Sequence, residues 1–445
     1  MFNNSTQTGS KFDAAVVGGG LSGLLAAVLI AREGRSVVLY EQARQLGGRA
    51  MTTDDDGIQF NMGAHALYRA GDAFRLLTKL QIPFQGAFPS PGTAVGYYRG
   101  REYTLPQSLR SLITTRLLSI REKWQFSRLL QSLPSIDTTA LHRVSAAQWV
   151  AEKFGSGPLA HLICTLFQLT TYVSDQNHLS AGAALDQLKL SLAGNVWYLD
   201  GGWQSLIDGL RHQAEQLGVQ IRPRSHITTV ESGPDGIALT LSSGAVDRAD
   251  AVILAIGPQA ACSLLQLSTD HPLVQWTARQ LPVRAACLDV ALSKLPRPGR
   301  RFALGLDEPL YFSVHSAAAK LAPEGVHVIQ LMKYLPANAV ESAGSVEQEL
   351  EGLLDRIQPG WRASLLKRRS LPLMTVAHCH PEPGDNDLTG RPVVTVSGHR
   401  RIYIAGDWVG VRGLLADAAA ASAEEAARQL LAQLPQRQTK AMQHA

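Results

Sequence analysis

The chain has 445 residues with 45% hydrophobic and 18% charged side chains, which suits two or three compact units and excludes an intrinsically disordered protein. Its net charge of +5 is matched by a single segment, Arg99 to Arg128, where seven basic and two acidic residues lie. Because no nucleic-acid-binding signature accompanies this segment, we expect no nucleic-acid partner.

Cysteine spacing and hydropathy exclude further classes. The four cysteines are scattered and form no Cys-x-x-Cys pair, so no metal site is expected. Residues 1–11 lack the apolar core of a secretory signal, and no run reaches the roughly 20 apolar residues of a membrane span. We therefore expect a cytoplasmic protein, with peripheral membrane contact as an open alternative.

A strand, a glycine turn, a helix and a second strand are predicted at the N-terminus. Residues 13–17 form a short apolar run typical of a buried parallel strand, and a glycine-rich turn over 18–23 follows at once. The pattern then predicts a helix over 24–31 and a strand over 36–40, which ends at an acidic residue, Glu41.

The chemistry of this unit indicates a dinucleotide site. Gly18, Gly20 and Gly23 have the G-x-G-x-x-G spacing, which permits a tight turn, close approach of a pyrophosphate and close packing of helix on strand. Positive charge at the helix N-terminus favours phosphates, and Glu41 is placed to accept hydrogen bonds from a ribose diol.

The segment after Glu41 contains Gly47-Gly48-Arg49, which resembles the G-G-R segment of the superfamily of phytoene desaturases, protoporphyrinogen oxidases and flavin amine oxidases. This resemblance implies that Gly48 and Arg49 lie along the pyrophosphate of FAD. A guanidinium also suits that place on chemical grounds, because it is a fixed fork of donors for phosphate oxygens.

A second resemblance lies at Asn61-Met62-Gly63-Ala64-His65, where the superfamily has an acidic residue, a glycine and often a histidine near the flavin ring. Asn61 replaces the commoner aspartate, and we expect its amide to keep a local hydrogen bond. Gly63 is expected to lie against the ring. His65 is a candidate catalytic proton shuttle, and a hydrogen-bonded structural histidine is the alternative.

Helical periodicity dominates from about residue 70 to 195, and the segment around residues 109–130 alternates apolar and basic faces. Arg110, Arg116, Arg121 and Lys123 lie on its basic face. Such a segment could rest on anionic lipid headgroups, or it could be an ordinary solvated surface helix. Both interpretations stay open.

The chain then alternates between the two expected units. A glycine pair at 201–202 before a helix over 205–217 resembles a return to the FAD-binding unit, where Ile227 matches the residue whose backbone contacts the adenine. Strands over 284–292, 302–315 and 326–335, separated by turns rich in Pro and Gly, predict an antiparallel meander.

The C-terminal segment completes the resemblance. A strand over 401–405 ends in Gly406-Asp407, and an Ala-rich helix over 414–431 follows. The resemblance implies that Asp407 bonds the ribityl chain and that the helix N-terminus points at the flavin, with Ala416 offering its backbone N–H. Ala418 and Ala423 stand where glycines are usual. No cysteine lies in this segment, so we expect FAD to be bound non-covalently.

These observations predict an α/β fold in which a Rossmann-type FAD-binding domain is interleaved with an α+β substrate domain of antiparallel sheet plus helices. The expected boundaries are 1–75, 195–265 and 375–445 for the FAD-binding domain, and 76–194 and 266–374 for the substrate domain. The expected cofactor-binding residues are Gly18, Gly20, Leu21, Ser22, Gly23, Glu41, Gln42, Gly48, Arg49, Gly63, Ala64, His65, Ile227, Gly406, Asp407, Leu415 and Ala416.

The resemblance implies hydride transfer to flavin N5 and favours desaturation or dehydrogenation of a mostly apolar small molecule, such as a polyene or terpenoid. Amine oxidation is the alternative, in which Lys333 holds a water near N5, although a solvated lysine at a strand end explains the same residue. A flavin-dependent isomerase or a lipid-binding protein is a third, non-redox hypothesis.

Overall fold

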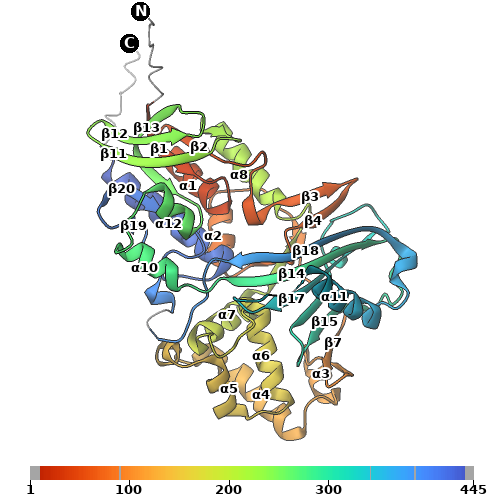
Figure 1. The fold of residues 1–445 in the computed structure, drawn as a ribbon. Coiled ribbons are helices and arrows are strands. Elements are labelled where there is room, and N and C mark those ends of the chain that lie inside the picture. Colours follow the sequence, from red (N-terminus) through yellow and green to blue (C-terminus); the bar gives the residue numbers. More distant parts are fainter. Residues whose placement is uncertain (1–10, 90–91, 341, 385–386, 436–445) are drawn as a thin grey trace, which may run out of the picture.

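The computed structural model describes residues 11–89, 92–340, 342–384 and 387–435, so the polar segment 1–10 lies outside the described residues. Figure 1 shows two large sheets joined by long strands, with a group of helices below them. The predicted α/β fold class, with a Rossmann-type sheet and a second mixed unit, is confirmed.

The first sheet has eight strands, and its parallel centre runs β10-β2-β1-β13-β20. β12 and β11 extend the sheet from the N-terminal half of β13 in antiparallel fashion, and β19 pairs with β20. The strands are β1 (Lys11–Val17), β2 (Val37–Tyr40), β10 (Gln220–Arg222), β11 (Ile227–Gly233), β12 (Gly236–Leu241), β13 (Val246–Leu254), β19 (Thr395–Val396) and β20 (His399–Ile404).

Helices cover this sheet because its strands are apolar on both faces. α1 (Leu21–Arg32) is buried over almost its whole length, since it packs between α8 (Gln204–Gln216) and α12 (Leu415–Gln433). α2 (Asp72–Lys79) packs on α12. The apolar core around this sheet, which includes Val16, Leu39 and Ile253, is called the dinucleotide core below. α9 (Pro258–Leu264) and α10 (Pro272–Arg279) complete the unit.

The second sheet has seven strands in the order β18-β14-β17-β16-β15-β7-β8. All neighbours are antiparallel except β15 and β7. The strands are β7 (Thr93–Tyr98), β8 (Arg101–Thr104), β14 (Val283–Leu292), β15 (Arg300–Gly305), β16 (Leu310–Val314), β17 (His327–Leu335) and β18 (Leu365–Ala377). α11 (Ala343–Ile357) packs on one face.

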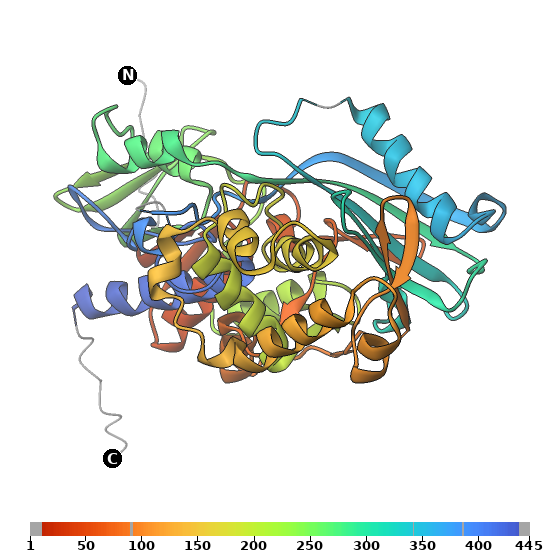
Figure 2. The same cartoon turned by 90° about the horizontal axis from the view of Figure 1, so that it is seen from below.

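The opposite face of this sheet meets a helical group, seen from below in Figure 2. Its members are α3 (Leu109–Thr114), α4 (Ile120–Ser132), α5 (Ala146–Phe154), α6 (Pro158–Thr171) and α7 (Ala181–Gly194). The apolar core between them, which includes Phe126, Phe167 and Tyr334, is called the substrate core below. Small strands β3 (Thr52–Asp55), β4 (Ile58–Asn61), β5 (Leu67–Tyr68), β6 (Gly86–Ala87) and β9 (Val196–Leu199) link the two units.

The meander is larger than the sequence predicts. The run 302–315 is two strands, β15 and β16, joined by a tight turn at 306–309. The expected strands do not include β18 or the hairpin of β7 and β8. Exposed and charged side chains interrupt the apolar alternation of β18 and of β8. No helix in the ranges that the structure describes is long and apolar enough to cross a membrane.

Candidate functional site

The three glycines of the G-x-G-x-x-G pattern, between β1 and α1, lie in two kinds of surroundings. Gly18 has φ +105°, and an added Cβ would lie 2.5 Å from the carbonyl oxygen of Ala255. A Cβ on Gly23 would lie 1.9 Å from the carbonyl oxygen of Gly18. By contrast, a Cβ on Gly20 would meet only the carbonyl oxygen of Gly47, at 3.8 Å. Packing therefore explains Gly18 and Gly23, whereas the protein leaves room beside Gly20.

This room continues toward the second glycine segment. Gly20 and Gly47 form an isolated parallel bridge, and a Cβ on Gly48 would come no closer than 4.0 Å to the Cα of Gly20. α1 begins here at Leu21 without a side-chain cap or an acidic residue in its first turn. The helix N-terminus has unpaired N–H groups, and no protein atoms crowd Gly20 or Gly48 beside it. Such a place is suited to an anion, so the residues present fit a pyrophosphate.

Glu41 is held firmly at the end of β2. Its Oε2 accepts a hydrogen bond from the backbone N–H of Gly19 at 2.7 Å, and its Oε1 accepts one from Ala43 at 2.8 Å. A carboxylate has about four acceptor positions, so two remain for ligand hydroxyls. The backbone N–H of Ser225 donates to the carbonyl of Glu41 at 2.8 Å, which brings the segment before Ile227 alongside.

Arg49 and Asp407, which are 358 residues apart, form a bidentate ion pair with N–O distances of 2.8 and 2.7 Å. The strand end of β18 adjoins this pair. Arg49 Nη1 also donates to the carbonyl of Val376 at 2.8 Å, and Asp407 accepts from both the backbone N–H and Nδ1 of His378 at 2.9 Å. The structure thus brings the expected phosphate and ribityl residues together, and adds His378, which the sequence analysis missed.

All four acceptor positions of Asp407 are occupied by these protein donors. Burial alone would raise the pKa of Asp407, but the charge of Arg49 and its hydrogen bonds hold this pKa well below the usual range. Asp407 is therefore a carboxylate throughout the physiological range. For it to accept a bond from a ligand hydroxyl, one protein donor must move, and Arg49, whose side chain is 39% exposed, is the donor expected to bind phosphate instead.

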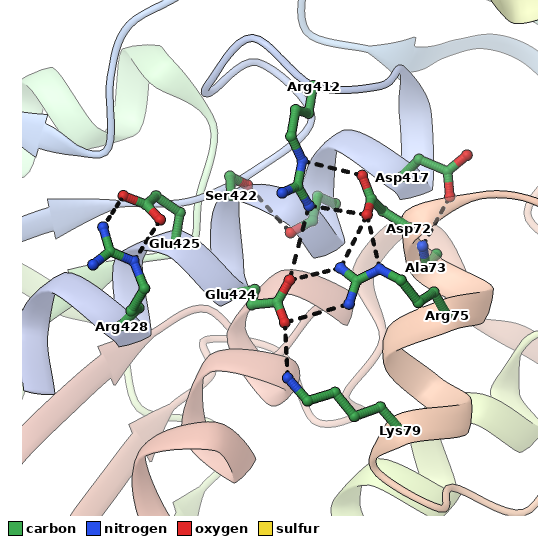
Figure 3. A network of polar contacts seen from close by, with 11 residues as sticks. Asp72, Ala73, Arg75, Lys79, Arg412, Asp417, Ser422, Glu424, Glu425 and Arg428 are labelled. Carbon is green, nitrogen blue, oxygen red and sulfur yellow. Dashed lines mark hydrogen bonds and ion pairs between the residues drawn. The ribbon is translucent and has the colours of Figure 1, made fainter.

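The loop after β20 is tied to α12 and to the interior. Ser422 in α12 bonds both backbone groups of Gly406 at 2.9 Å, and it is drawn with its neighbours in Figure 3. Arg391 donates to the carbonyls of Asp407 and Gly413 at 2.9 and 2.7 Å. Because both ends of the loop are fixed, the Asp407 carboxylate is held in one place.

The first residues of α12 join the two cores. Leu415 has φ +54°, in the left-handed region that favours glycine, and its side chain packs on the substrate core. Ala416 packs instead on the dinucleotide core. Ala418 and Ala423, which stand where the superfamily has glycines, are fully buried, so the small side chain of alanine is accommodated at both positions.

Asp417 caps the start of α2 (Figure 3). Its Oδ1 accepts from the backbone N–H of Ala73 at 2.9 Å, while Oδ2 is buried and has no hydrogen-bond partner among the described residues. Burial and the nearby charge of Asp72 raise the pKa of Asp417 to about 7, and the bond from Ala73 opposes that shift. A cavity of about 380 Å³ adjoins it, lined in part by Gly71 and Arg412.

The turn at Gly63 faces the second sheet. Gly63 has φ +83°, and an added Cβ would lie 3.0 and 3.1 Å from the sulfur atoms of Met374 and Cys287. Its carbonyl accepts from Gln330 Nε2 at 3.1 Å and from His65 Nδ1 at 3.0 Å. Burial lowers the pKa of His65, so the ring is neutral and carries its proton on Nδ1.

Asn61 keeps a structural hydrogen bond, as expected. Its Oδ1 accepts from Thr52 Oγ1 at 2.7 Å and from the backbone N–H of Trp203 at 2.9 Å. Gly202, which precedes Trp203, cannot carry a side chain because a Cβ would lie 2.6 Å from Asn61 Oδ1. The glycine pair at 201–202 therefore allows a close contact with the Asn61 strand.

Lys333 lies on the wrong face of the second sheet for the role expected of it. Met332 and Tyr334, its neighbours in β17, belong to the substrate core that also contacts Ala64. Lys333 alternates to the opposite face, where its Nζ forms an ion pair with Glu349 of α11 at 2.9 Å. To hold a water near a flavin beside Gly63, the side chain would have to lie on the other face of the sheet. The hypothesis that Lys333 has this role is therefore wrong.

Two family profiles cover the chain. The family described as flavin containing amine oxidoreductase matches residues 21–287, and the family described as FAD dependent oxidoreductase matches residues 165–429. A 4,4'-diaponeurosporene oxygenase of Staphylococcus aureus is 27% identical over 272 residues, which are 54% of either chain. A flavin-containing monoamine oxidase of Mycobacterium tuberculosis is 26% identical over 263 residues, 55% of this chain and 57% of that one.

The chain therefore spans about half the length of the curated relatives that it matches. Solved structures share the fold over almost the whole chain. An oxidoreductase from Methanosarcina mazei has TM-score 0.75 at 18% identity, covering 94% of this chain and 99% of that one. Putrescine oxidase bound to putrescine has TM-score 0.73 at 17% identity, covering 95% and 100%. Because the first family matches more than half of the sequence, the protein belongs to the flavin containing amine oxidoreductase family, and its cofactor is FAD.

Proposed function

We propose that the protein is an FAD-dependent oxidoreductase that desaturates or dehydrogenates a mostly apolar small molecule, such as a polyene or terpenoid. Bound FAD supplies a hydride acceptor, and the protein supplies orientation and exclusion of water. Gly20, Gly48 and Arg49 would hold the pyrophosphate, Glu41 the ribose, and Asp407 the ribityl chain. The relative described as a 4,4'-diaponeurosporene oxygenase favours this class of substrate.

The observation that carries the proposal is the apolar character of the sheet face beside the turn at Gly63. Cys287 and Met374 lie against Gly63, and Tyr172 donates from its hydroxyl to the carbonyl of Ala64 at 3.0 Å. The ring of Tyr334 lies 6.1 Å from that of Tyr172. These side chains are sulfur-containing or aromatic, so they suit an apolar substrate better than a charged one.

His65 is the titratable group closest in sequence to this turn. With its proton on Nδ1 and directed at Gly63, its Nε2 is the atom that could accept a proton from a substrate. The alternative, a structural histidine that only fixes the turn, predicts the same hydrogen bond. His65→Gln separates them, because an amide donor can keep the turn but accepts no proton: a shuttle predicts a slower reduction of the flavin with unchanged FAD affinity.

Amine oxidation is the second candidate, favoured by the relative described as a monoamine oxidase. The placement of Lys333 removes the side chain that was expected to support it. The two candidates differ in which compounds bleach the flavin when oxygen is excluded. We expect bleaching by polyenes, and none by primary amines or porphyrinogens.

The variant Lys333→Met also distinguishes oxidation of an apolar substrate from amine oxidation. Because Lys333 contacts α11, this change should leave the rate of flavin reduction unaltered, as should the matched control Glu349→Gln, which removes the partner of the same ion pair. Bleaching by amines that is lost in Lys333→Met but kept in Glu349→Gln would establish amine oxidation instead. A protein that binds FAD but is bleached by no member of the panel would favour a non-redox role.

A further inference from the structure

Four large apolar side chains stand in solvent at two neighbouring short helices. Leu109 and Ile113 of α3 are 74% and 64% exposed, and Ile120 and Trp124 of α4 are 88% and 61% exposed. Each pair is spaced four residues apart, so its two members lie on one side of their helix. These four residues are called the α3–α4 surface below.

The fold does not use these side chains. α3 buries no residue at all. α4 already has an inward side, where Phe126 and Leu129 are buried in the substrate core. At about 100° per residue, Ile120 and Trp124 lie on the opposite side of α4 from Leu129. α4 is therefore apolar on two opposite sides, and only one of them is explained by the protein interior.

Basic residues surround the α3–α4 surface. Arg110, Arg116, Arg121 and Arg128 are all exposed, and the guanidinium of Arg128 lies over the ring of Trp124 at 5.3 Å. The one acidic residue of α4, Glu122, is engaged as the capping partner of Ser119 at the start of the helix. The exposed charged residues between Leu109 and Ser132 are thus all basic, since Glu122 is only partly exposed.

We propose that the α3–α4 surface docks the protein on an anionic lipid bilayer, a property that goes beyond its proposed redox function. Ile120 and Trp124 would enter the headgroup region while the arginines contact lipid phosphates, which is the arrangement of an interfacial amphipathic helix. A second copy of the chain fits less well, because a symmetric contact would bring two sets of arginines together.

The position of the surface agrees with this use. In Figure 1 α3 and α4 lie at the lower end of the molecule, away from β11, β12 and β13 at the upper end. The inward side of α4 belongs to the same substrate core that packs on Ala64. The end of the molecule that would dock is therefore also the end that contains the substrate core.

Sedimentation with vesicles tests this proposal on the full-length protein loaded with FAD. Vesicles of phosphatidylcholine and phosphatidylglycerol at three to one should bind it, pure phosphatidylcholine should bind it at least tenfold less, and 0.5 M NaCl should release it. Arg110→Gln, Arg116→Gln and Arg121→Gln combined should weaken binding on the order of 100-fold, at about fivefold for each charge. Ile120→Ser with Trp124→Ser should weaken it at least tenfold.

Matched controls separate this surface from general charge and hydropathy. Arg32, Arg211 and Arg248 are exposed basic residues of the dinucleotide unit, and Leu192 and Val340 are exposed apolar residues elsewhere. The triple change of these arginines to Gln, and the double change of Leu192 and Val340 to Ser, should leave binding within twofold. FAD content and thermal melting confirm that each variant is folded, which is expected because the altered side chains are exposed.

Equal binding of the wild type to neutral and anionic vesicles, or equal losses in the control variants, would overturn the proposal. So would concentration-dependent dimerisation that the Ile120→Ser and Trp124→Ser variant abolishes, because a second copy would then be the occupant. The readout does not depend on catalysis, so failure of the proposed oxidoreductase function would leave this test intact.

Discussion

The dinucleotide sheet and the substrate sheet present their functional groups in different ways. At the dinucleotide sheet the groups are mostly backbone N–H groups and glycine surfaces that follow one strand end, within the local run from Gly18 to Gly23. At the substrate sheet they are side chains whose face is decided by strand register, as Lys333 and its neighbours show. Local pattern therefore specifies the glycine turn of the first site, whereas long-range pairing specifies which side chains face the second.

The largest effect should come from the glycine turn. Gly20→Val should fold yet bind no FAD, because its side chain enters the room that the protein leaves free, and Gly20 already has an extended backbone. Gly23→Val is the contrasting variant: its Cβ would overlap the carbonyl of Gly18, so it should fail to fold. Thermal melting without cofactor and FAD content after purification distinguish them. An unfolded Gly20→Val would mean that packing, not ligand space, requires this glycine.

Asp407→Ala should come next. It leaves Arg49 without its bidentate partner and frees the loop contact to His378, so FAD should be held loosely and misaligned. A displacement of about 1 Å can cost on the order of 100-fold in rate, and we expect a loss of this size in flavin reduction under excess FAD. Arg428→Ala lies farther along, in α12, where among the described residues its guanidinium forms an ion pair with the half-exposed Glu425, and this change should be nearly silent. Wild-type rates in Asp407→Ala would contradict the placement of the C-terminal segment.

Glu41→Ala should weaken FAD binding about 10- to 150-fold, since a charge-assisted hydrogen bond is worth roughly 1.5–3 kcal/mol. Part of the loss would come from the turn itself, because Glu41 also holds the backbone N–H groups of Gly19 and Ala43. Glu41→Gln keeps an acceptor and should lose less. Titration of the apoprotein with FAD measures both, and equal affinity in all three proteins would place the ribose elsewhere.

The smallest effect concerns Asp417 at the junction of α2 and α12. Its pKa is about 7 when folded against an ordinary value of 3.8, so the folded protein retains a proton that the unfolded chain releases between these pH values. The contribution of this group to the free energy of unfolding therefore falls as pH rises and is lost above about pH 7.

Asp417→Asn cannot ionise but keeps an acceptor for Ala73. Its melting temperature should exceed that of the wild type by about a few degrees at pH 8, and the difference should narrow towards pH 5. Glu425→Gln, a change on the same helix at a half-exposed carboxylate that pairs with Arg428, controls for the loss of one charge. A difference that does not vary with pH would show that Asp417 is ionised in the folded protein.

The part of the site made by backbone was predictable. The strand, glycine turn, helix and acid at residues 13–41 form as expected, and so do the strand before Gly406 and the helix after it. Each of these follows from apolar runs, glycines and their spacing, all of which are local. The resemblance to the superfamily added Arg49 and Asp407, which no local pattern could have placed side by side.

The rest depended on contacts between distant segments. His378 reaches Asp407 only because β18 crosses from the substrate sheet to the dinucleotide unit, and its sequence interrupts the apolar alternation that would have revealed a strand. One feature of the sequence indicates a contact at Asp417, because an acidic residue on the buried side of an Ala-rich helix needs a hydrogen-bond partner. No feature of the sequence indicates on which face of the sheet Lys333 lies, since a shift of one residue in register moves a side chain to the other face.

We expect the glycine turn, Glu41 and the pair Arg49–Asp407 to hold one FAD without a covalent bond. Measurement of flavin in the purified wild-type protein, before and after acid precipitation, examines both the binding and its non-covalent character. We predict a yellow protein with one FAD for each chain, all of which is recovered in the supernatant. A protein that stays colourless when FAD is added would contradict the site, and flavin that remains in the pellet would contradict its non-covalent character.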